Sequence, residues 1–261
     1  MRVGIIGMGH VGHNVADRLR RAGVETVTYD IADGRPYPEK ALSTCAFVVV
    51  AVGTPPGLDG AADVSDVVEA VKRIPCERVL LRSTVPPGTT DELVAATNKS
   101  ICFSPEYVGE TTFASNSWDQ WAHDQSFQII GGEPEDRRWF LGTLTAIEGA
   151  GTRFFECSAV EAEIIKYMEN CYLATKVTFV NEFYDLCQRV GANWFAVREG
   201  WLLDPRVERD HTAVFPDDRG YSGRCLPKDV DALLSFAQSQ GLPMPLISAV
   251  RAANEHYKRG S

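Results

Sequence analysis

The sequence predicts an α/β fold in which a parallel sheet with crossover helices is followed by an all-helical part with one long central helix. Short apolar runs alternate with amphipathic segments up to about residue 155, a pattern typical of strands joined by crossover helices. A glycine-rich turn follows the first run, and a long segment without glycine or proline begins after residue 156. We therefore expect two domains, residues 1–155 and 156–261.

The first domain is expected to hold a sheet of short apolar strands. Each run is bounded by turn residues or by an amphipathic segment long enough to be a helix. The expected strands are Val3–Ile6, Thr26–Tyr29, Phe47–Val52, Val79–Leu81, Ile101–Phe103, Phe127–Ile130 and Arg153–Phe155. One expected helix follows the first strand and ends near Arg21, and two others span Ala61–Arg73 and Pro134–Thr145.

The second domain is expected to be organised by one long helix. Ser158 and Glu161 form a capping box, and no glycine or proline follows until Gly191. Such a helix would be roughly 45–50 Å long. Because it is apolar on more than one face, we expect it to be buried or to form a homodimer interface. An irregular stretch and two helices, Pro227–Gly241 and Leu246–Tyr257, complete this domain.

Composition and charge exclude several classes of partner. The 35 acidic and 26 Lys and Arg residues give a net charge of −9, which opposes binding to nucleic acid or to an anionic membrane surface. The apolar run Ala46–Val52 is too short to span a bilayer, and the N-terminus does not resemble a signal peptide. Seven cysteines without a CxxC pair indicate a reducing, cytoplasmic compartment and no metal site.

A dinucleotide-binding fingerprint lies at the first predicted turn. The hexapeptide Gly7-Met8-Gly9-His10-Val11-Gly12 follows a strand and opens a helix, as in a Rossmann-type domain. These glycines allow a tight turn and a close approach of the backbone to a pyrophosphate. Asp30 closes the second strand, where a carboxylate binds ribose hydroxyls and repels a 2′-phosphate. The sequence therefore predicts NAD as the cofactor.

Two polar groups in the second half suggest chemistry without proving it. Lys166 and Asn170 lie four residues apart on one helix face, so they are either a structural pair or donors to a developing oxyanion. Cys225 lies just ahead of a predicted helix start, which favours its thiolate form, although a packed thiol is the alternative. Asp229 lies in the first turn of the same helix, where complementing the helix dipole is the simple explanation.

Taken together, segments along nearly the whole chain resemble the UDP-glucose/GDP-mannose dehydrogenase family. The resemblance lies in GMGHVG, VVVAVGTPP, STVPPGTT, SPEYVGE, EAEIIKYMENCYLATKVTFVNEFYDLC, DPRV, GYSGRCLPKDVDAL and PLISAVRAANE, in the order of that family. It implies oxidation of a sugar 6-hydroxyl to a carboxylate by NAD in two steps, through an aldehyde and a thioester on cysteine.

The resemblance also implies roles for individual residues. Cys225 would be the nucleophile, Lys166 and Asn170 would stabilise oxyanions, Glu106 would be the base for thioester hydrolysis, and Thr84 and Asp229 would order a water. The implied cofactor residues are Gly7, Gly9, His10, Val11, Gly12, Asp30, Val52, Gly53, Thr54, Thr84 and Glu110, and the implied substrate residues are Glu106, Tyr107, Val108, Lys166, Asn170, Arg206, Tyr221 and Gly223.

The chain departs from the family pattern at two points. Family members continue into a C-terminal nucleotide-binding domain that this sequence does not contain, so we expect a short form acting on a nucleotide sugar or a smaller alcohol. The spacing from Arg206 to Cys225 is also longer than the family pattern. Two alternatives stay open: a two-electron dehydrogenase of the 3-hydroxyacid type, and a non-catalytic NAD-binding partner of a full-length enzyme.

Overall fold

The computed structural model describes residues 1–107, 127–149 and 151–259, which form two compact units. Unit 1 comprises Met1–Gly57 and Ala62–Lys166, and unit 2 comprises Leu58–Ala61 and Tyr167–Ser261. The division falls inside a long helix, because the first turns of that helix pack on the core of the sheet. The domain boundary expected near residue 155 lies slightly earlier in the chain and stays a prediction.

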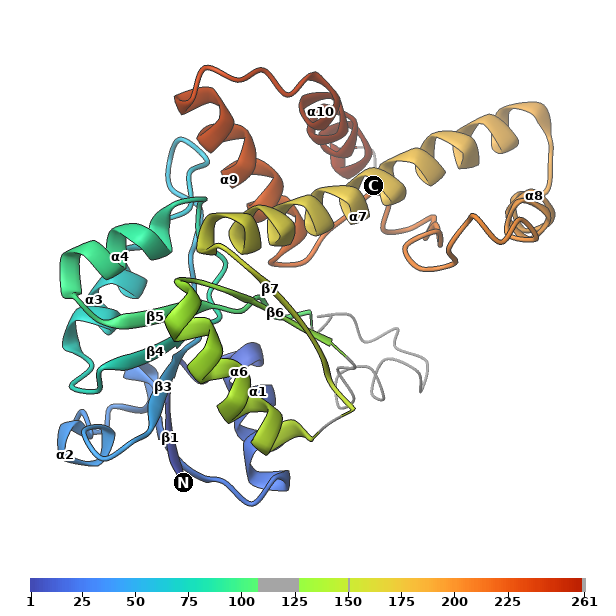
Figure 1. Cartoon of the computed structure of the whole chain (residues 1–261). Coiled ribbons are helices and arrows are strands. Elements are labelled where there is room, and N and C mark those ends of the chain that lie inside the picture. Colours follow the sequence, from blue (N-terminus) through green and yellow to red (C-terminus); the bar gives the residue numbers. More distant parts are fainter. Residues whose placement is uncertain (108–126, 150, 260–261) are drawn as a thin grey trace. The chain divides into compact units, whose positions relative to one another are not determined.

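A seven-stranded sheet with the order β2-β1-β3-β4-β5-β6-β7 forms the centre of unit 1 (Figure 1). Each strand overlaps an apolar run that the sequence predicts, so the α/β class is confirmed. The strands are β1 (Arg2–Ile6), β2 (Glu25–Tyr29), β3 (Phe47–Val50), β4 (Arg78–Leu81), β5 (Ser100–Phe103), β6 (Phe127–Gly131) and β7 (Arg153–Cys157).

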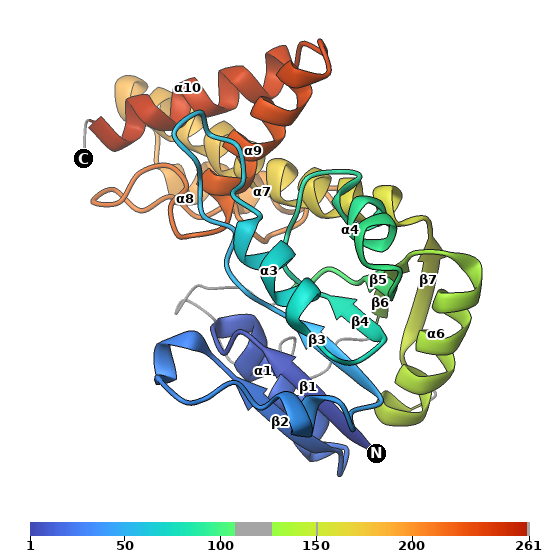
Figure 2. The same cartoon turned by 90° about the vertical axis from the view of Figure 1, so that its left-hand side faces the viewer.

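Helices cover both faces of this sheet (Figure 2). Alternate strand residues such as Val48 and Val49 point to opposite faces and belong to separate apolar clusters. One cluster joins the strands to α2, α3 and α4, and the other joins them to α1 and α6. The helices of unit 1 are α1 (His10–Arg21), α2 (Glu39–Leu42), α3 (Ser65–Arg73), α4 (Thr89–Thr97) and α6 (Pro134–Glu148), with a 3-10 turn η1 (Ile31–Asp33).

Helix α4 was not among the expected helices. Its sequence, TTDELVAAT, presents only Leu93 as a large buried apolar side chain, so helical periodicity is weak. The preceding segment STVPPGTT reads as a turn, and its last two residues in fact begin the helix. Tertiary contacts, described below, supply what the local sequence lacks.

The sheet is not wholly parallel, which corrects the sequence prediction. β6 pairs antiparallel to β5 through Phe103 and Gly131, the last residues of both strands. β7 then pairs parallel to β6, with Gly131 opposite Cys157. The strands β6 and β7 therefore end level with the carboxyl edge of β5, and the helix that follows β7 begins at that edge.

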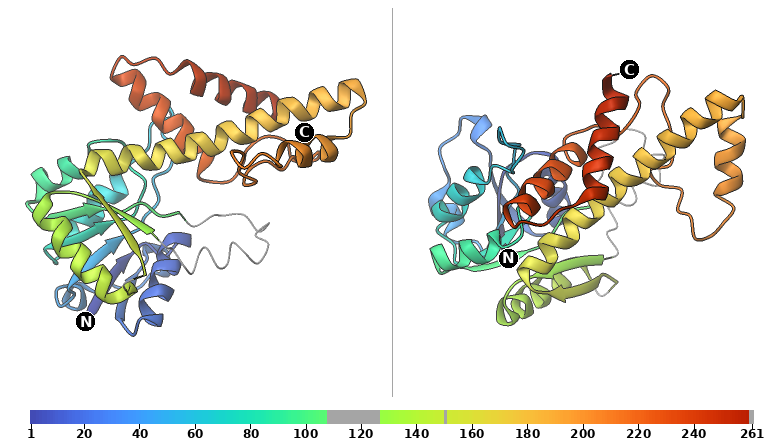
Figure 3. Two further views of the ribbon diagram at one scale, coloured as in Figure 1. Left: turned by 45° about the vertical axis from the view of Figure 1, so that its right-hand side comes forward. Right: turned by 90° about the horizontal axis from the view of Figure 1, so that it is seen from above.

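Unit 2 is all helical, as predicted, and is organised along α7 (Figure 3). Cys171 and Ala174 of α7 pack with Val230 and Val250 in one apolar cluster. Asn193 caps the short helix α8 by accepting hydrogen bonds from two backbone amides, a signal that the sequence analysis missed. The helices are α7 (Ala159–Val190), α8 (Trp194–Trp201), α9 (Leu226–Ser239) and α10 (Pro245–Arg259).

We searched the described helices for candidate membrane spans. None combines the length and the hydrophobicity that crossing a bilayer requires.

Candidate functional site

The turn between β1 and α1 requires two of its glycines for steric reasons. A Cβ atom on Gly12 would lie 1.9 Å from the carbonyl oxygen of Gly7, and one on Gly7 would lie 2.6 Å from the carbonyl oxygen of Ala51. Gly7 also has a φ of +89°, which side chains rarely adopt. A Cβ atom on Gly9, by contrast, would meet no atom within 4 Å among the described residues. Gly9, the second glycine of the motif, therefore leaves space among the described residues at the start of α1.

Asp30 closes this turn from the end of β2. Its carboxylate accepts hydrogen bonds from the backbone amides of Met8, at 2.6 Å, and Ala32, at 2.9 Å. These bonds lower the pKa of Asp30, so it is ionised at neutral pH. An ionised carboxylate beside the glycine turn fits the ribose of NAD, while the N-terminal end of α1 fits its pyrophosphate. His10 and Val11 occupy the first turn of that helix.

The loops after β3 and β4 are joined at the carboxyl edge of the sheet. Thr54 Oγ1 donates a hydrogen bond of 2.9 Å to the carbonyl oxygen of Thr84. Ser83 Oγ donates one of 2.8 Å to the carbonyl oxygen of Val52. The structure thus brings Val52, Thr54 and Thr84 together, with Gly53 exposed between the first two.

Glu106, from the SPE motif, belongs to a buried group of charges in unit 1. Its Oε2 atom lies 3.3 Å from the NH1 atom of Arg82 and 4.0 Å from NH1 of Arg18. Arg82 also donates to Gln128 Oε1 at 3.2 Å, and Arg18 pairs with Glu148 at 2.5 Å. Burial of Arg82 lowers its pKa, while Glu106 opposes this shift. Two guanidinium groups therefore lie beside the Glu106 side chain.

Lys166 and Tyr107 meet in the same unit. The Lys166 ammonium lies 4.7 Å from the centre of the Tyr107 ring, a cation–π distance, and Lys166 is only 9% exposed. Since Tyr107 directly follows Glu106, this contact places the predicted lysine beside the SPE motif. The predicted residues Val108 and Glu110 lie outside the described residues.

In unit 2, the start of α9 gathers three predicted residues. Asn170 Nδ2 of α7 donates a hydrogen bond of 2.5 Å to Asp229 Oδ2, and both side chains are buried. Lys228 Nζ pairs with the other oxygen of Asp229 at 2.5 Å. Cys225 is the N-cap residue of α9, and its carbonyl oxygen accepts the Asp229 amide at 2.9 Å. One helix turn thus links Cys225 to the Asn170–Asp229 pair.

Three other predicted substrate residues stand in different settings. The Tyr221 side chain is buried in the apolar cluster with α9 and α10, and its backbone bonds to Asn254. Gly223 has a φ of +84°, so glycine suits this loop just before Cys225. The Arg206 side chain is 87% exposed and pairs with Asp204, two residues earlier. Their roles toward a substrate stay predictions.

The remaining cysteines differ from Cys225 in their surroundings. Burial raises the pKa of the Cys45 thiol to about 11 and that of Cys171 to about 12. Burial also raises the pKa of Cys102 and Cys157. Such thiols stay protonated at neutral pH and pack as small apolar groups. Cys225 is half-buried and is the N-cap residue of α9.

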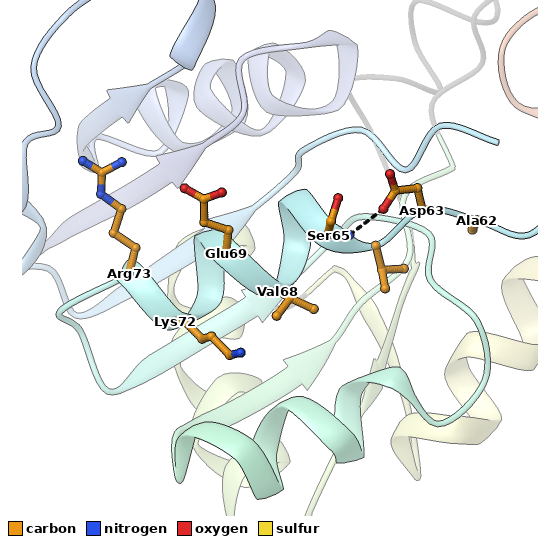
Figure 4. Close-up of a pocket in the computed structure, with 8 residues that line it drawn as sticks. Ala62, Asp63, Ser65, Val68, Glu69, Lys72 and Arg73 are labelled. Carbon is orange, nitrogen blue, oxygen red and sulfur yellow. Dashed lines mark hydrogen bonds between the residues drawn. The ribbon is translucent and has the colours of Figure 1, made fainter. Parts of the chain in front are cut away.

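Sequence reasoning missed two buried charged residues. Arg82 ends the apolar strand run VLLR, and Glu163 lies on the long helix in EAEIIK, where the sequence is apolar on several faces. A charge inside an otherwise apolar pattern was the available signal in both cases. Figure 4 shows a hollow beside α3, lined by residues including Asp63, Glu69 and Arg73, and none of the predicted site residues lines it.

The comparisons with known proteins agree with this geometry. Residues 37–137 match the model of the UDP-glucose/GDP-mannose dehydrogenase family, NAD binding domain, and residues 160–256 match that family's central domain. A UDP-glucose 6-dehydrogenase of Rickettsia typhi is 28% identical over 97% of this chain, and UDP-glucose 6-dehydrogenase YwqF of Bacillus subtilis is 30% identical over 90% of it. The structure of a UDP-glucose dehydrogenase from Pyrobaculum islandicum matches 98% of the chain with a TM-score of 0.83 and 27% identity.

The match covers only part of each relative. The chain spans 63% of the Rickettsia protein, 55% of YwqF and 68% of the Pyrobaculum chain. The linked edge loops lie within the matched NAD-binding domain, and the cysteine at the start of α9 lies within the matched central domain. On these grounds the chain belongs to the UDP-glucose/GDP-mannose dehydrogenase family.

Proposed function

We propose that this protein is an NAD-dependent dehydrogenase that oxidises the primary alcohol of a UDP- or GDP-sugar, or of a smaller relative, to a carboxylate. The observation that carries the proposal is the start of α9, where Cys225 is one helix turn from the buried Asn170–Asp229 pair. A helix start favours thiolate, and the pair supplies an amide donor beside it. A two-electron dehydrogenase needs no such thiol.

NAD, held by the glycine turn and Asp30 of unit 1, supplies the acceptor for hydride in each of two oxidations. The first oxidation converts the alcohol to an aldehyde. The Cys225 sulfur then forms a bond to the aldehyde carbon, and the carbonyl oxygen takes up the proton, which gives a thiohemiacetal. Loss of a second hydride and a proton gives a thioester. Water cleaves the C–S bond, releasing the carboxylic acid and the thiol.

Each polar side chain of the proposed site has a task in this scheme. Lys166 and Asn170 donate to the oxygen that becomes negative during the additions to the carbonyl carbon. Glu106, which lies beside the guanidinium groups of Arg82 and Arg18, takes a proton from the hydrolytic water. Thr84 and Asp229 order a water that carries protons from the alcohol. Their arrangement around one substrate is part of the proposal.

The experiment measures NADH formed per substrate consumed on UDP-sugars, GDP-mannose and simple sugar phosphates. We expect two NADH per substrate for the wild type. Cys225→Ala should form no acid, because no thioester can form. Cys157→Ser is the matched control, since this half-buried thiol lies outside the proposed site, and it should keep the wild-type ratio.

Other outcomes would decide between the alternatives. One NADH per substrate, unchanged in Cys225→Ala, would contradict the covalent scheme and favour a two-electron dehydrogenase of the 3-hydroxyacid type. NAD binding without turnover on any tested alcohol would favour a non-catalytic partner.

The proposal includes a homodimer formed through unit 2. Large apolar side chains are exposed along α7 and on α8, among them Met168, Phe179, Phe183, Phe195 and Trp201. The Phe179 ring lies 4.8 Å from Phe183 and 5.8 Å from Trp201, so these rings form one patch. An exposed patch of this kind is typical of a subunit interface. Light scattering should give a dimer for the wild type and a monomer for Phe179→Glu; a monomeric wild type would contradict this part.

A further inference from the structure

We propose that Glu163 is a positioning residue that fixes Lys166 and the Thr84 loop at one edge of the sheet. The proposal rests on the dehydrogenase function, in which Lys166 donates to the substrate oxygen and Thr84 orders a water. Glu163 itself is assigned no contact with substrate or cofactor.

The Glu163 carboxylate binds the start of α4 with both oxygens. Oε2 accepts the backbone amide of Gly88 at 2.6 Å. Oε1 accepts the Thr90 amide at 2.9 Å and the Thr90 hydroxyl at 2.6 Å. Glu163 is 0% exposed. A carboxylate from α7 thus serves as the cap of α4.

This cap comes from a distant element because the local sequence offers none. The N-cap residue of α4 is Gly88, which has no side chain and a φ of +96°. A serine, threonine or aspartate at an N-cap would satisfy the amides locally, without burying a charge. A buried carboxylate costs more free energy than such a cap unless its hydrogen bonds repay it. Because the cap comes from a distant segment, it also holds the first turns of α7 against the start of α4.

The link connects residues of the proposed site. Thr84 lies four residues before Gly88 in the same segment, and its carbonyl oxygen accepts the Thr54 hydroxyl. Lys166 follows Glu163 by three residues, so the two are neighbours on the surface of α7. The ammonium of Lys166 in turn lies against Tyr107, next to Glu106. Glu163 therefore sets the position of the first two turns of α7, which belong to unit 1, relative to the loop after β4.

Four variants test the proposal at pH 8: Glu163→Ala, Glu163→Gln, Thr90→Val and, as control, Glu92→Gln. Glu92 is an exposed carboxylate in the first turn of α4. Turnover is measured well below the melting temperature of each variant, together with NAD affinity and deuterium exchange. We expect kcat of Glu163→Ala to fall about 10- to 100-fold, as for misplacement of a reacting group. NAD affinity should fall less than kcat, since the glycine turn and Asp30 are untouched and only the Thr84 loop is displaced.

The remaining variants should lose less activity than Glu163→Ala. Glu163→Gln keeps one acceptor oxygen and should retain more activity than Glu163→Ala. Thr90→Val removes a single donor and should fall between Glu163→Gln and the wild type. Glu92→Gln should match the wild type. A Glu163→Ala protein that melts earlier but keeps wild-type kcat would overturn the proposal, because capping alone would explain it.

Deuterium exchange separates this proposal from the proposed function. If the wild type turns over no substrate, the function fails and exchange decides the role of Glu163. Faster exchange in Glu163→Ala both at 84–92 and around Lys166 supports the link between the two segments. Faster exchange confined to α4 overturns it.

Discussion

Helices α1 and α4 both begin at the carboxyl edge of parallel strands, and both begin after a glycine, yet their N-terminal ends differ. A Cβ atom on Gly9, which precedes α1, would meet no described atom within 4 Å, and the first turn of α1 holds no acidic residue. Gly88 precedes α4, and the carboxylate of Glu163 accepts its amide and that of Thr90. Both helix ends carry the same partial positive charge. The protein neutralises the start of α4, and we expect the start of α1 to bind the phosphates of a cofactor.

This difference distinguishes a helix start that can bind a ligand from one that is bound by another helix of the protein. A helix N-terminus attracts any nearby anion, so the neighbouring backbone decides whether that anion belongs to the protein or to a ligand. At α1 the glycine turn lets a ligand approach. At α4 a buried side chain of another helix already occupies the position.

The largest expected effect is at the turn that shapes α1. In Gly12→Ala, the new Cβ would lie 1.9 Å from the Gly7 carbonyl oxygen, which cannot move without disturbing the turn. We expect the free energy of unfolding to fall by about 3 kcal/mol, as in overpacked sites, and NAD binding to be lost. Chemical denaturation and NAD titration measure both. Unchanged stability would show that the turn is more pliant than this geometry allows.

The next effect is the pH dependence of the free energy of unfolding that arises from Glu163, the residue that caps α4. Burial raises the pKa of Glu163 to about 7 from its ordinary 4.5, although the bonds from Thr90 and Gly88 lower it and Asp91 raises it further. The folded state therefore binds the proton more tightly than the unfolded state. The stability this provides is fully present below pH 4.5 and is lost as the pH rises through about 7.

The measurement compares urea denaturation of the wild type and Glu163→Gln from pH 5 to pH 8. We expect the wild type to lose about 3 kcal/mol more than the variant over this range. Parallel pH profiles for the two proteins would show that Glu163 titrates as in the unfolded chain.

A smaller effect is expected at Gly88. A Cβ atom here would meet no described atom within 4 Å, so only the backbone conformation, with a φ of +96°, opposes a side chain. Gly88→Ala should lower the free energy of unfolding by about 1 kcal/mol. Thermal denaturation at fixed pH measures this. A loss several times larger would mean that the substitution also breaks the Glu163 bonds.

The smallest stability effect is expected at Gly9. Its φ is −73°, which alanine adopts readily, and a Cβ atom there is also free of described neighbours. Gly9→Ala should change the free energy of unfolding by less than about 0.5 kcal/mol. It should nevertheless weaken NAD binding, since the methyl group enters the space left for the pyrophosphate. Unchanged NAD affinity would contradict the assignment of this helix end to the cofactor.

Local patterns were sufficient for much of this protein. The apolar runs mark all seven strands, the capping box of Ser158 and Glu161 marks the start of α7, and Pro227 marks the start of α9 within a residue. These features depend on neighbours a few residues away. Helix α4 was not expected, because its cap comes from the distant Glu163. The strand β6 was expected, but its antiparallel direction was not, because the pairing of Phe103 with Gly131 determines it.

The candidate site divides in the same way. Gly7, Asp30 and Cys225 could be named from the sequence, because a glycine turn, a strand end and a helix start each have a local signature. Arg82 could not, because its role comes from contacts with Glu106 and Gln128, which lie on other segments of the chain.

By itself, the sequence determined the α/β class, the long helix and the residue types suited to NAD and to a thiol nucleophile, since periodicity, capping and backbone freedom act over one or two turns. Only the tertiary structure decided which charges are buried together and which helix start is occupied. The reason is that a buried carboxylate is stabilised by donors from other elements, as Glu163 is by Gly88 and Thr90.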